Sequence, residues 1–365
     1  MSDVFFADLR ANSKINWLDK VSRLYDAAGF NELIKPGDLV AVKVHFGEKG
    51  NTAYVRPQYV RRLVDRIKEA GGKPFITDGN TLYRGSRSNA VDHLQTAVEN
   101  GWGYSVVGAP LIIADGLTGK DYLKVPIDGK HFNEVKIGAA AAHANALIAV
   151  SHFKGHEVTG FGGVLKNLGM GLGSRSGKQN MHSDILPSVK VEKCLACGLC
   201  RDWCPADAIE MEPHAVITEE RCLGCGECTV TCPESAIRIQ WKTTPNAIQE
   251  KIVEYTIGAL KGKEKKTGYI TFLMDISPEC DCCTYNDSPL VGNIGILAGR
   301  DPVALDQACV DLVNSQPVLP NSMLGNLVNV TDVFRAVHKD TDWSIQLAYG
   351  EQMGLGTRKY NLAKI

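Results

Sequence analysis

The sequence predicts an α/β body with a mainly parallel sheet, interrupted by a small cysteine-rich unit. Two observations predict the body: strand-like apolar runs alternate with helical periodicity near the start of the chain, and the same alternation resumes near its end. A third observation marks the interruption, because eight of the twelve cysteines fall between Cys194 and Cys232. We expect residues 1–187 to form the first part of the body, 188–241 the cysteine-rich unit, and 242–365 the second part.

The first part begins its α/β pattern with an apolar, strand-like run at residues 39–44. Pro57 opens an expected helix that the glycine pair at 71–72 closes, and residues 74–77 are expected to form the next strand. Strand, helix and strand in this order indicate a βαβ unit with parallel pairing. A further apolar run at residues 146–150 is expected to add a strand.

After the cysteine-rich unit, the pattern predicts helices at about residues 245–260 and 301–313 and strands at 269–274 and 294–297. Neither flank alone looks like a complete sheet. The simplest architecture is therefore one body of roughly 300 residues, split by the insertion. Two independent flanking domains are the alternative.

Composition and charge narrow the class of protein. The hydrophobic content of 44% and charged content of 22% are typical of globular proteins. The formal net charge of -1 predicts neither nucleic acid nor a membrane as partner. No apolar run reaches the length of a membrane span, and the first residues lack the pattern of a signal peptide. These features predict a cytoplasmic protein; the oligomeric state stays open.

The cysteine-rich unit contains two runs with the spacing C-x₂-C-x₂-C-x₃-C-P, repeated at an offset of 28 residues. Zinc sites typically use separated C-x₂-C pairs around one ion, so this spacing argues against zinc. In two-cluster iron–sulfur proteins the fourth cysteine of each run ligates the other cluster. The predicted ligand sets are Cys194, Cys197, Cys200 and Cys232 for cluster one, and Cys222, Cys225, Cys228 and Cys204 for cluster two.

The two runs resemble those of bacterial two-cluster ferredoxins over about fifty residues. This resemblance implies an inserted α+β ferredoxin-like domain, two [4Fe–4S] clusters as cofactors and low-potential one-electron chemistry. It also implies a redox partner protein.

A glycine-rich segment at residues 151–182 follows the expected strand at 146–150. Glycines let backbone amides approach an anion, and cations add positive charge, so a phosphate-bearing small molecule is the expected ligand. A tight crossing of loops with solvated basic side chains is the alternative. The candidate residues are His156, His182 and Lys166 as catalytic groups, and Lys154, Gly162, Gly163 and Arg175 as cofactor-binding groups.

Outside the cysteine runs, the chain resembles the family known as domain of unknown function 362, members of which often carry a ferredoxin insert. The resemblance rests on residues 42–47, 151–182, 278–282 and 295–306. It implies a fold family more than an activity.

The same glycine-rich segment is distantly similar to nickel-pincer-nucleotide lactate racemases. His156, Lys166 and His182 match that family's spacing of ten and sixteen residues, and Arg56 before Pro57 matches its early Arg-Pro, a cofactor-binding position. The resemblance implies that Lys166 tethers the cofactor, His182 ligates the metal and His156 is an acid or base. The chain departs from the family at residues 78–83, which lack a second catalytic histidine, and racemisation by two bases needs both.

The remaining cysteines offer a third metal site. Cys280 and Cys282 are candidate ligands, with Cys283 a weaker one, and free thiols are the alternative. Cys309 is expected to be structural. His45 ends a predicted strand and is expected either to face the ligand crevice or to be an ordinary edge histidine.

Three functions stay open. The sequence favours an iron–sulfur oxidoreductase that passes single electrons through two [4Fe–4S] clusters to a ligand or metal site in the body. The alternatives are a non-catalytic electron carrier that docks to a larger redox enzyme, and a metallo-isomerase related to the racemases. An electron carrier needs no phosphate-binding histidine segment, which is why we favour the first.

Overall fold

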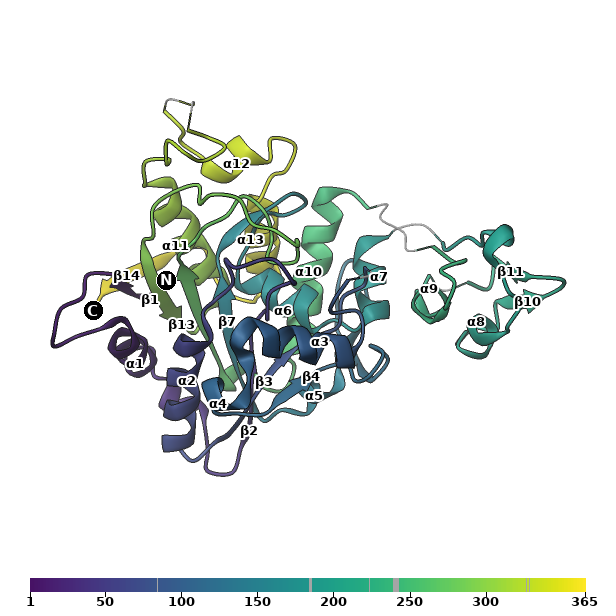
Figure 1. The fold of residues 1–365 in the computed structure, drawn as a ribbon, viewed down its shortest axis with the longest axis horizontal. Coiled ribbons are helices and arrows are strands. Elements are labelled where there is room, and N and C mark those ends of the chain that lie inside the picture. The colour runs from purple at the N-terminus through teal and green to yellow at the C-terminus, as the bar shows by residue number, and fades with distance from the viewer. Residues whose placement is uncertain (84, 184–185, 223, 239–242, 326, 328) are drawn as a thin grey trace.

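The computed structural model describes the whole chain except residues 84, 184–185, 223, 239–242, 326 and 328, and the predicted boundary at 241/242 falls in one of these gaps. An eight-stranded sheet forms the centre of the body (Figure 1). In sheet order its strands are β14 (Tyr360–Lys364), β1 (Ser2–Asp8), β13 (Gly295–Gly299), β12 (Thr267–Leu273), β7 (Ala146–His152), β2 (Leu39–Lys43), β3 (Lys73–Asp78) and β4 (Leu111–Ile113).

The sheet is mainly parallel, as the sequence predicts. Only β13, among the strands of this sheet in the described chain, runs antiparallel to its neighbours, β1 and β12. The other neighbouring strands pair in parallel. Strands from both sides of the cysteine-rich unit meet in this one sheet, because β12 pairs with β7. The α/β body with a mainly parallel sheet is thus confirmed.

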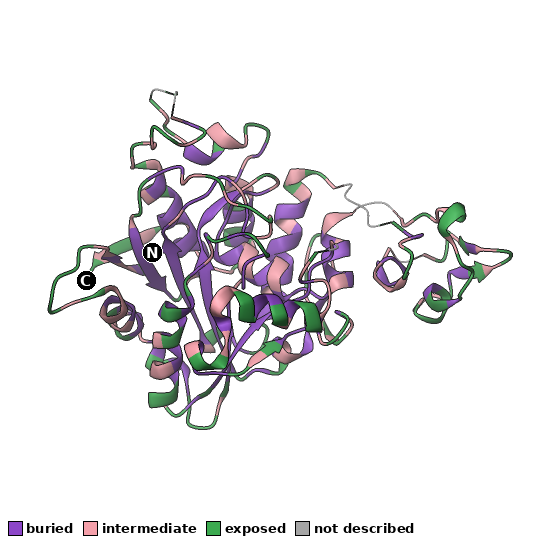
Figure 2. Cartoon of the chain, viewed as in Figure 1, coloured by how far each residue is buried: buried purple, intermediate pink, exposed green. Residues whose placement is uncertain are grey.

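Helices cover both faces of the sheet, and alternate residues of β7 pack on opposite faces. Ile148 and Val150 point to the face covered by α1 to α4, whereas Leu147 and Ala149 point to the other face. Burial on both faces explains why these strands are continuous apolar runs (Figure 2). The helices of the first face are α1 (Trp17–Ala27), α2 (Pro57–Glu69), α3 (Ala90–Ala97) and α4 (Tyr104–Val107). Those of the second are α5 (Ala139–His143), α6 (Val164–Leu172), α7 (Arg175–His182), α10 (Pro245–Leu260), α11 (Pro302–Asn314), α12 (Val333–Val337) and α13 (Ser344–Gln352).

Two aspartates near the start of α11 fix helix ends. The side chain of Asp301 accepts hydrogen bonds from the amides of Val303 and Ala304 and so caps α11 itself. Asp306, one turn further along, instead accepts from the amides of Val164 (2.7 Å) and Leu165 (3.0 Å). It thereby caps α6, a helix within the glycine-rich segment, from another element.

Short elements make up the rest of the chain. Two of the described hairpins belong to the body, and the cysteine-rich unit contains a third hairpin and two short helices. The hairpins are β5 (Tyr122–Pro126) with β6 (Glu134–Gly138), β8 (Lys154–His156) with β9 (Gly160–Gly162), and β10 (Ile209–Met211) with β11 (Ala215–Ile217); the helices are α8 (Leu199–Asp202) and α9 (Glu227–Thr231). Of the helices described, none has the length and apolar character needed to cross a membrane.

Candidate functional site

A cavity of about 240 Å³ lies at the carboxyl ends of β2, β3 and β7. β2 and β7 are neighbours in the sheet, but the chain continues from β2 to β3 and from β7 to β12, on opposite sides. Such a topological switch point is where open α/β sheets bind ligands. The residues around the cavity come from these strand ends, from β8 and α6, and from α7, α10 and the loop after β12.

Five cationic side chains line the cavity, against two carboxylates among its described residues. The cations are Lys43, Arg87, Lys154, Lys166 and Lys178, and the carboxylates are Asp78 and Glu157. Two of the cations are partly balanced by carboxylates that do not line the cavity: Arg87 pairs with Glu48, and Lys154 pairs with Asp281. Burial lowers the pKa of Lys178 to about 8, so this lysine is mostly protonated at pH 7. A cavity with this surplus of positive groups favours an anionic ligand.

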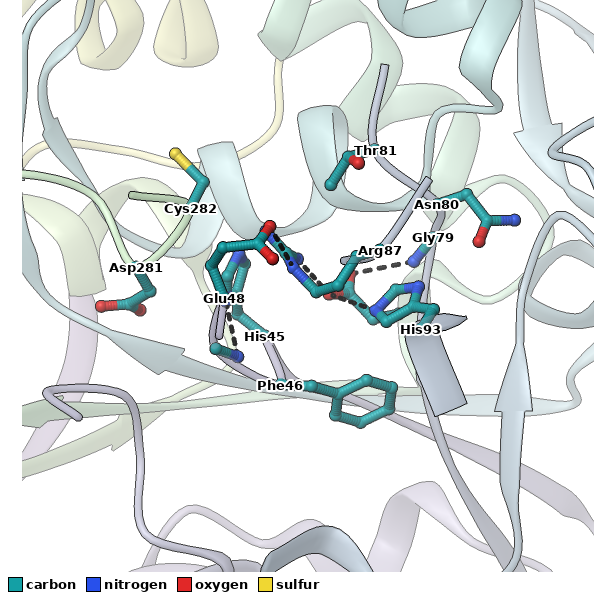
Figure 3. Close-up of polar contacts among 12 residues, drawn as sticks. His45, Phe46, Glu48, Gly79, Asn80, Thr81, Arg87, His93, Asp281 and Cys282 are labelled. Atoms are coloured by element: carbon teal, nitrogen blue, oxygen red, sulfur yellow. Dashed lines mark hydrogen bonds and ion pairs between the residues drawn. The ribbon is translucent and has the colours of Figure 1, made fainter. Parts of the chain in front are cut away.

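A buried network of charges forms the wall at the end of β3 (Figure 3). Asp78 lies 2.9 Å from Lys43 Nζ and 3.5 Å from Arg87. Arg87 Nε also lies 3.1 Å from Glu48, and its guanidinium donates to the Tyr83 hydroxyl at 2.6 Å. Burial alone would raise the pKa of Asp78, but the neighbouring cations hold it well below its usual range. The wall is therefore a set of paired charges.

Three histidines line the cavity, and their hydrogen bonds fix which nitrogen carries the proton. His156 Nδ1 accepts from the amides of Val158 and Thr159, both at 3.2 Å, so its neutral ring carries the proton on Nε2. His182 Nδ1 donates to the Lys178 carbonyl at 2.8 Å, which leaves the lone pair of its neutral ring on Nε2.

The electrostatics of the cavity keep these rings neutral. Burial, followed by the charge of Lys166, holds the pKa of His156 well below its usual value. Burial likewise lowers the pKa of His182 to about 4. His45 also lines the cavity, which answers the question that the sequence left open for it. At pH 7 the neutral His156 can therefore donate a hydrogen bond from Nε2–H, and the neutral His182 can accept one at Nε2, within one cavity.

Cys280 and Cys282, on the loop after β12, also line the cavity. Lys166 Nζ donates to Cys280 Sγ at 3.2 Å. The thiol of Cys282 and burial together raise the pKa of Cys280 well above its ordinary range. Within the residues that the structure describes, no three His, Cys, Asp or Glu side chains stand where they could share one metal ion. A third metal at Cys280 and Cys282 stays a prediction.

The other predicted binding residues divide between the cavity and its surroundings. Lys154 and Gly163 line the cavity, and Gly162 packs against the side chains of Lys154 and Lys166. Arg175 donates to the carbonyls of Thr81 (2.9 Å) and Leu82 (3.4 Å), so it supports a lining loop from behind.

Arg56 lies elsewhere. It forms an ion pair with Asp275 at 3.3 Å and is half-exposed in a separate surface recess. The structure therefore does not bring Arg56 to the cavity that His156, Lys166 and His182 share.

Sequence reasoning missed the charged wall. Lys43 and Asp78 are the last residues of β2 and β3, and Arg87 follows β3 by nine positions. A charged residue at the last position of an otherwise apolar strand was the available signal, because parallel strands present their carboxyl ends at one edge of the sheet. Nothing local in the sequence marks Arg87 or Glu48.

The cysteine-rich unit contains two smaller cavities. One is lined by Cys194, Cys197, Cys200 and Cys232, and the other by Cys204, Cys222, Cys225 and Cys228. Each thus combines three cysteines of one run with the fourth of the other run. The two sets are those that the sequence assigns to clusters one and two.

Backbone amides point at several of these sulfurs. The amides of Ala208 and Ala236 donate to Cys204 Sγ (3.3 Å) and Cys232 Sγ (3.2 Å). Hydrogen bonds of this kind favour a thiolate over a thiol. A four-iron cluster takes one thiolate per iron, so its ligands surround a larger volume than those of a single ion. The donor set and its arrangement around two cavities fit such clusters.

A family model described as "Domain of unknown function (DUF362)" matches residues 40–311, well over half of the chain. The chain belongs to this family. The matched stretch includes every residue found to line the large cavity. The cavity therefore lies within the part of the chain that matches the DUF362 family.

Individual relatives are distant. A thylakoid-associated protein of Synechocystis sp. is 27% identical to this DUF362 chain over 145 residues, which are 38% of this chain and 41% of the relative. The match thus spans less than half of that relative's length.

Two solved structures are also similar to this chain. The lactate racemase apoprotein from Thermoanaerobacterium thermosaccharolyticum has 11% sequence identity and a TM-score of 0.37, over 75% of this chain and 51% of that one. A Thermotoga maritima protein has 13% identity and a TM-score of 0.37, over 80% and 57%. The chain spans little more than half of either protein. At these TM-scores the likeness carries no argument about activity.

Proposed function

We propose that the protein is an iron–sulfur oxidoreductase that passes single electrons through two [4Fe–4S] clusters to an anionic ligand in the large cavity. One observation carries the proposal: the eight cysteines line two cavities in crossed sets of four. When bound, the clusters supply one-electron transfer. We infer that the cysteine-rich unit is an inserted ferredoxin-like domain and that it takes its electrons from a partner protein.

The residues of the large cavity supply the remaining roles. Lys154 and Lys178 bind the anion, and Lys166, which donates to Cys280 Sγ, adds a further positive charge to the cavity. Apolar side chains of α10, Ile248 and Ile252, line one part of the cavity and limit the access of water. The neutral ring of His156 donates a hydrogen bond from Nε2–H and so stabilises a ligand that gains negative charge on reduction.

A reductive titration tests this function. Protein purified without oxygen should take up about two electrons per chain from dithionite, one for each four-iron cluster, and return them to an oxidant. The variant Cys228→Ala should take up fewer, because it lacks one ligand of cluster two. Protein that contains iron yet takes up no electrons reversibly would contradict the proposal.

A metal-dependent isomerase is the second candidate. The observation that favours it is that His156, Lys166 and His182, at the spacing that resembles the nickel-pincer racemases, line one cavity. Nickel bound to protein that lacks the eight ferredoxin cysteines would favour this candidate. Iron as the sole bound metal, with reversible electron uptake, would exclude it.

A further inference from the structure

We propose that cluster two is the centre on the side of the large cavity, and that a buried ion pair, Lys136 with Glu227, sets its reduction potential. The inference rests on the proposed function, since it assumes that both cysteine sets bind four-iron clusters. Lys136 belongs to the body, whereas Glu227 lies between Cys225 and Cys228 in the cysteine-rich unit.

Helix α7 connects the large cavity to the loop of cluster two. Lys178 and His182 are four residues apart, share one face of α7 and line the cavity. Asn180 lies between them on the opposite face, and its side chain donates to the Gly224 carbonyl at 2.7 Å. Figure 1 shows α7 at the side of the body nearest α9. One helix, about 10–12 Å across with its side chains, therefore separates a ligand in the cavity from the cluster-two loop.

The approach of this loop to α7 depends on a glycine. Gly226 has a φ of 73°, and a Cβ at this position would stand 2.5 Å from Cγ of Gln179 on α7. Gly226 lies between Cys225 and Glu227, within the ligand run of cluster two. The α7 side chain thus packs directly on the backbone of that run.

A buried ion pair holds the same run from the body. Lys136 Nζ, on β6, lies 3.0 Å from Glu227 Oε1 and donates to the Cys225 carbonyl at 3.1 Å. The Tyr122 hydroxyl donates to the same Glu227 oxygen at 2.7 Å. Both charged side chains are less than one-tenth exposed, at 9% and 5%. Charges so shielded from solvent are weakly screened, so each acts on a neighbouring cluster more strongly than a surface charge does.

The cluster-one loop is more open to solvent. Leu195 and Leu199 are 69% and 42% exposed, and Cys197 is exposed as well. An external one-electron carrier can therefore approach cluster one, whereas α7 and β6 cover cluster two. Electrons would enter at cluster one and pass to cluster two, with one cluster oxidised as the other is reduced.

Removing the positive or the negative charge of the Lys136–Glu227 pair should shift the reduction potential of cluster two in opposite directions. Lys136→Met removes a positive charge and should lower the potential of cluster two, because reduction adds negative charge. Glu227→Gln should raise the potential of the same cluster. The two potentials are measured by redox titration of the intact, iron-loaded chain with electron paramagnetic resonance, and Cys228→Ser identifies the signal of cluster two.

Two controls keep the test decisive. The double variant Lys136→Met/Glu227→Gln has no unpaired buried charge and should return the potential toward the wild-type value. Arg201→Met removes an exposed cation, paired with Asp202, beside the cluster-one run and should leave cluster two unchanged. Shifts of equal size in both clusters, or none in either single variant, would overturn the assignment.

A separate experiment with sulfate, as the anion in the cavity, tests whether cluster two is the cluster nearer to the cavity. Saturating sulfate should lower the potential of cluster two more than that of cluster one, relative to chloride at the same ionic strength. Equal shifts or no shift would overturn the placement of cluster two on the cavity side. Absence of iron from the purified chain would instead refute the proposed function itself, so the two failures are distinguishable.

Discussion

The α/β body and the cysteine-rich unit differ in what can hold them folded. The body buries both faces of its sheet under helices, in two large apolar clusters. Among the described residues of the cysteine-rich unit, the apolar cluster has five buried members, and two of these are the candidate ligands Cys200 and Cys228. A core of this size contributes little apolar burial. We therefore expect the body to fold on its own side chains and, if the proposed clusters bind, the cysteine-rich unit to depend on them for its stability.

The largest expected effect follows from removing iron. A chelator under reducing conditions should abolish amide-exchange protection in β10, β11 and α9, because the apo unit lacks the core to stay folded. Strands β2 and β7 should keep their protection. Hydrogen exchange followed by mass spectrometry measures both regions in one sample. A cysteine-rich unit that stays protected without metal would contradict this difference between the two regions.

The body should instead be most sensitive at its buried charges. Arg87→Met leaves Glu48 and Asp78 without their shared cation and should lower the free energy of unfolding by about 3–5 kcal/mol. The control Arg61→Met removes an exposed partner of Asp65 and should cost at most about 1 kcal/mol. Urea unfolding followed by circular dichroism measures both. Equal costs for the two variants would contradict a buried, paired network.

A smaller loss in the free energy of unfolding is expected when Asp306, the residue of α11 that caps α6, is replaced. Asp306→Ala leaves two buried amides at the start of α6 without an acceptor and should cost about 2–3 kcal/mol. Asn89→Ala removes the more exposed cap of α3 and should cost about 1 kcal/mol. Iron content should stay at the wild-type level in Asp306→Ala. A loss of iron would show that the stabilities of the two regions are coupled.

The smallest expected effect is on anion affinity. Lys178, with a pKa of about 8, is mostly protonated at pH 7 and mostly neutral at pH 9. Sulfate, whose charge is constant over this range, should therefore bind more weakly as pH rises. Lys178→Met should bind sulfate about tenfold more weakly at pH 7, ~1.4 kcal/mol, and lose most of the pH dependence.

Isothermal titration calorimetry at the two pH values measures this difference. Lys124→Met, an exposed cation paired with Glu134, should keep the wild-type profile. If the wild-type affinity does not change with pH, Lys178 has no part in binding the anion.

Much of the body could be predicted because its signals are local. The helix predicted at 245–260 is α10, and the strand at 146–150 is the first part of β7. A strand buried on both faces is a continuous apolar run, so the sequence shows it directly. Pro57 marks a helix start because proline lacks the amide hydrogen that a residue inside a helix would donate. The strand order could not be predicted in the same way, since the pairing of β12 with β7 joins residues more than a hundred positions apart.

The residues of the candidate site also divide into those with a local sequence signal and those without one. The glycine-rich segment predicted that His156, Lys166 and His182 belong together, and all three line one cavity. Arg87 and Glu48 also belong to the site, but they come from loops. Only the folded sheet brings Arg87 to both Glu48 and Asp78, so no local pattern could identify them. Arg56 shows the opposite case, because a matching dipeptide did not place its side chain in the cavity.

The most direct test of the account is the metal and acid-labile sulfide content of protein purified without oxygen. Two four-iron clusters require about eight irons and about eight sulfides per chain. Replacing Cys194 or Cys222 by serine should lower that content, while the body stays folded. Intact protein that holds zinc in place of iron, or fewer than about four irons, would contradict the presence of two four-iron clusters.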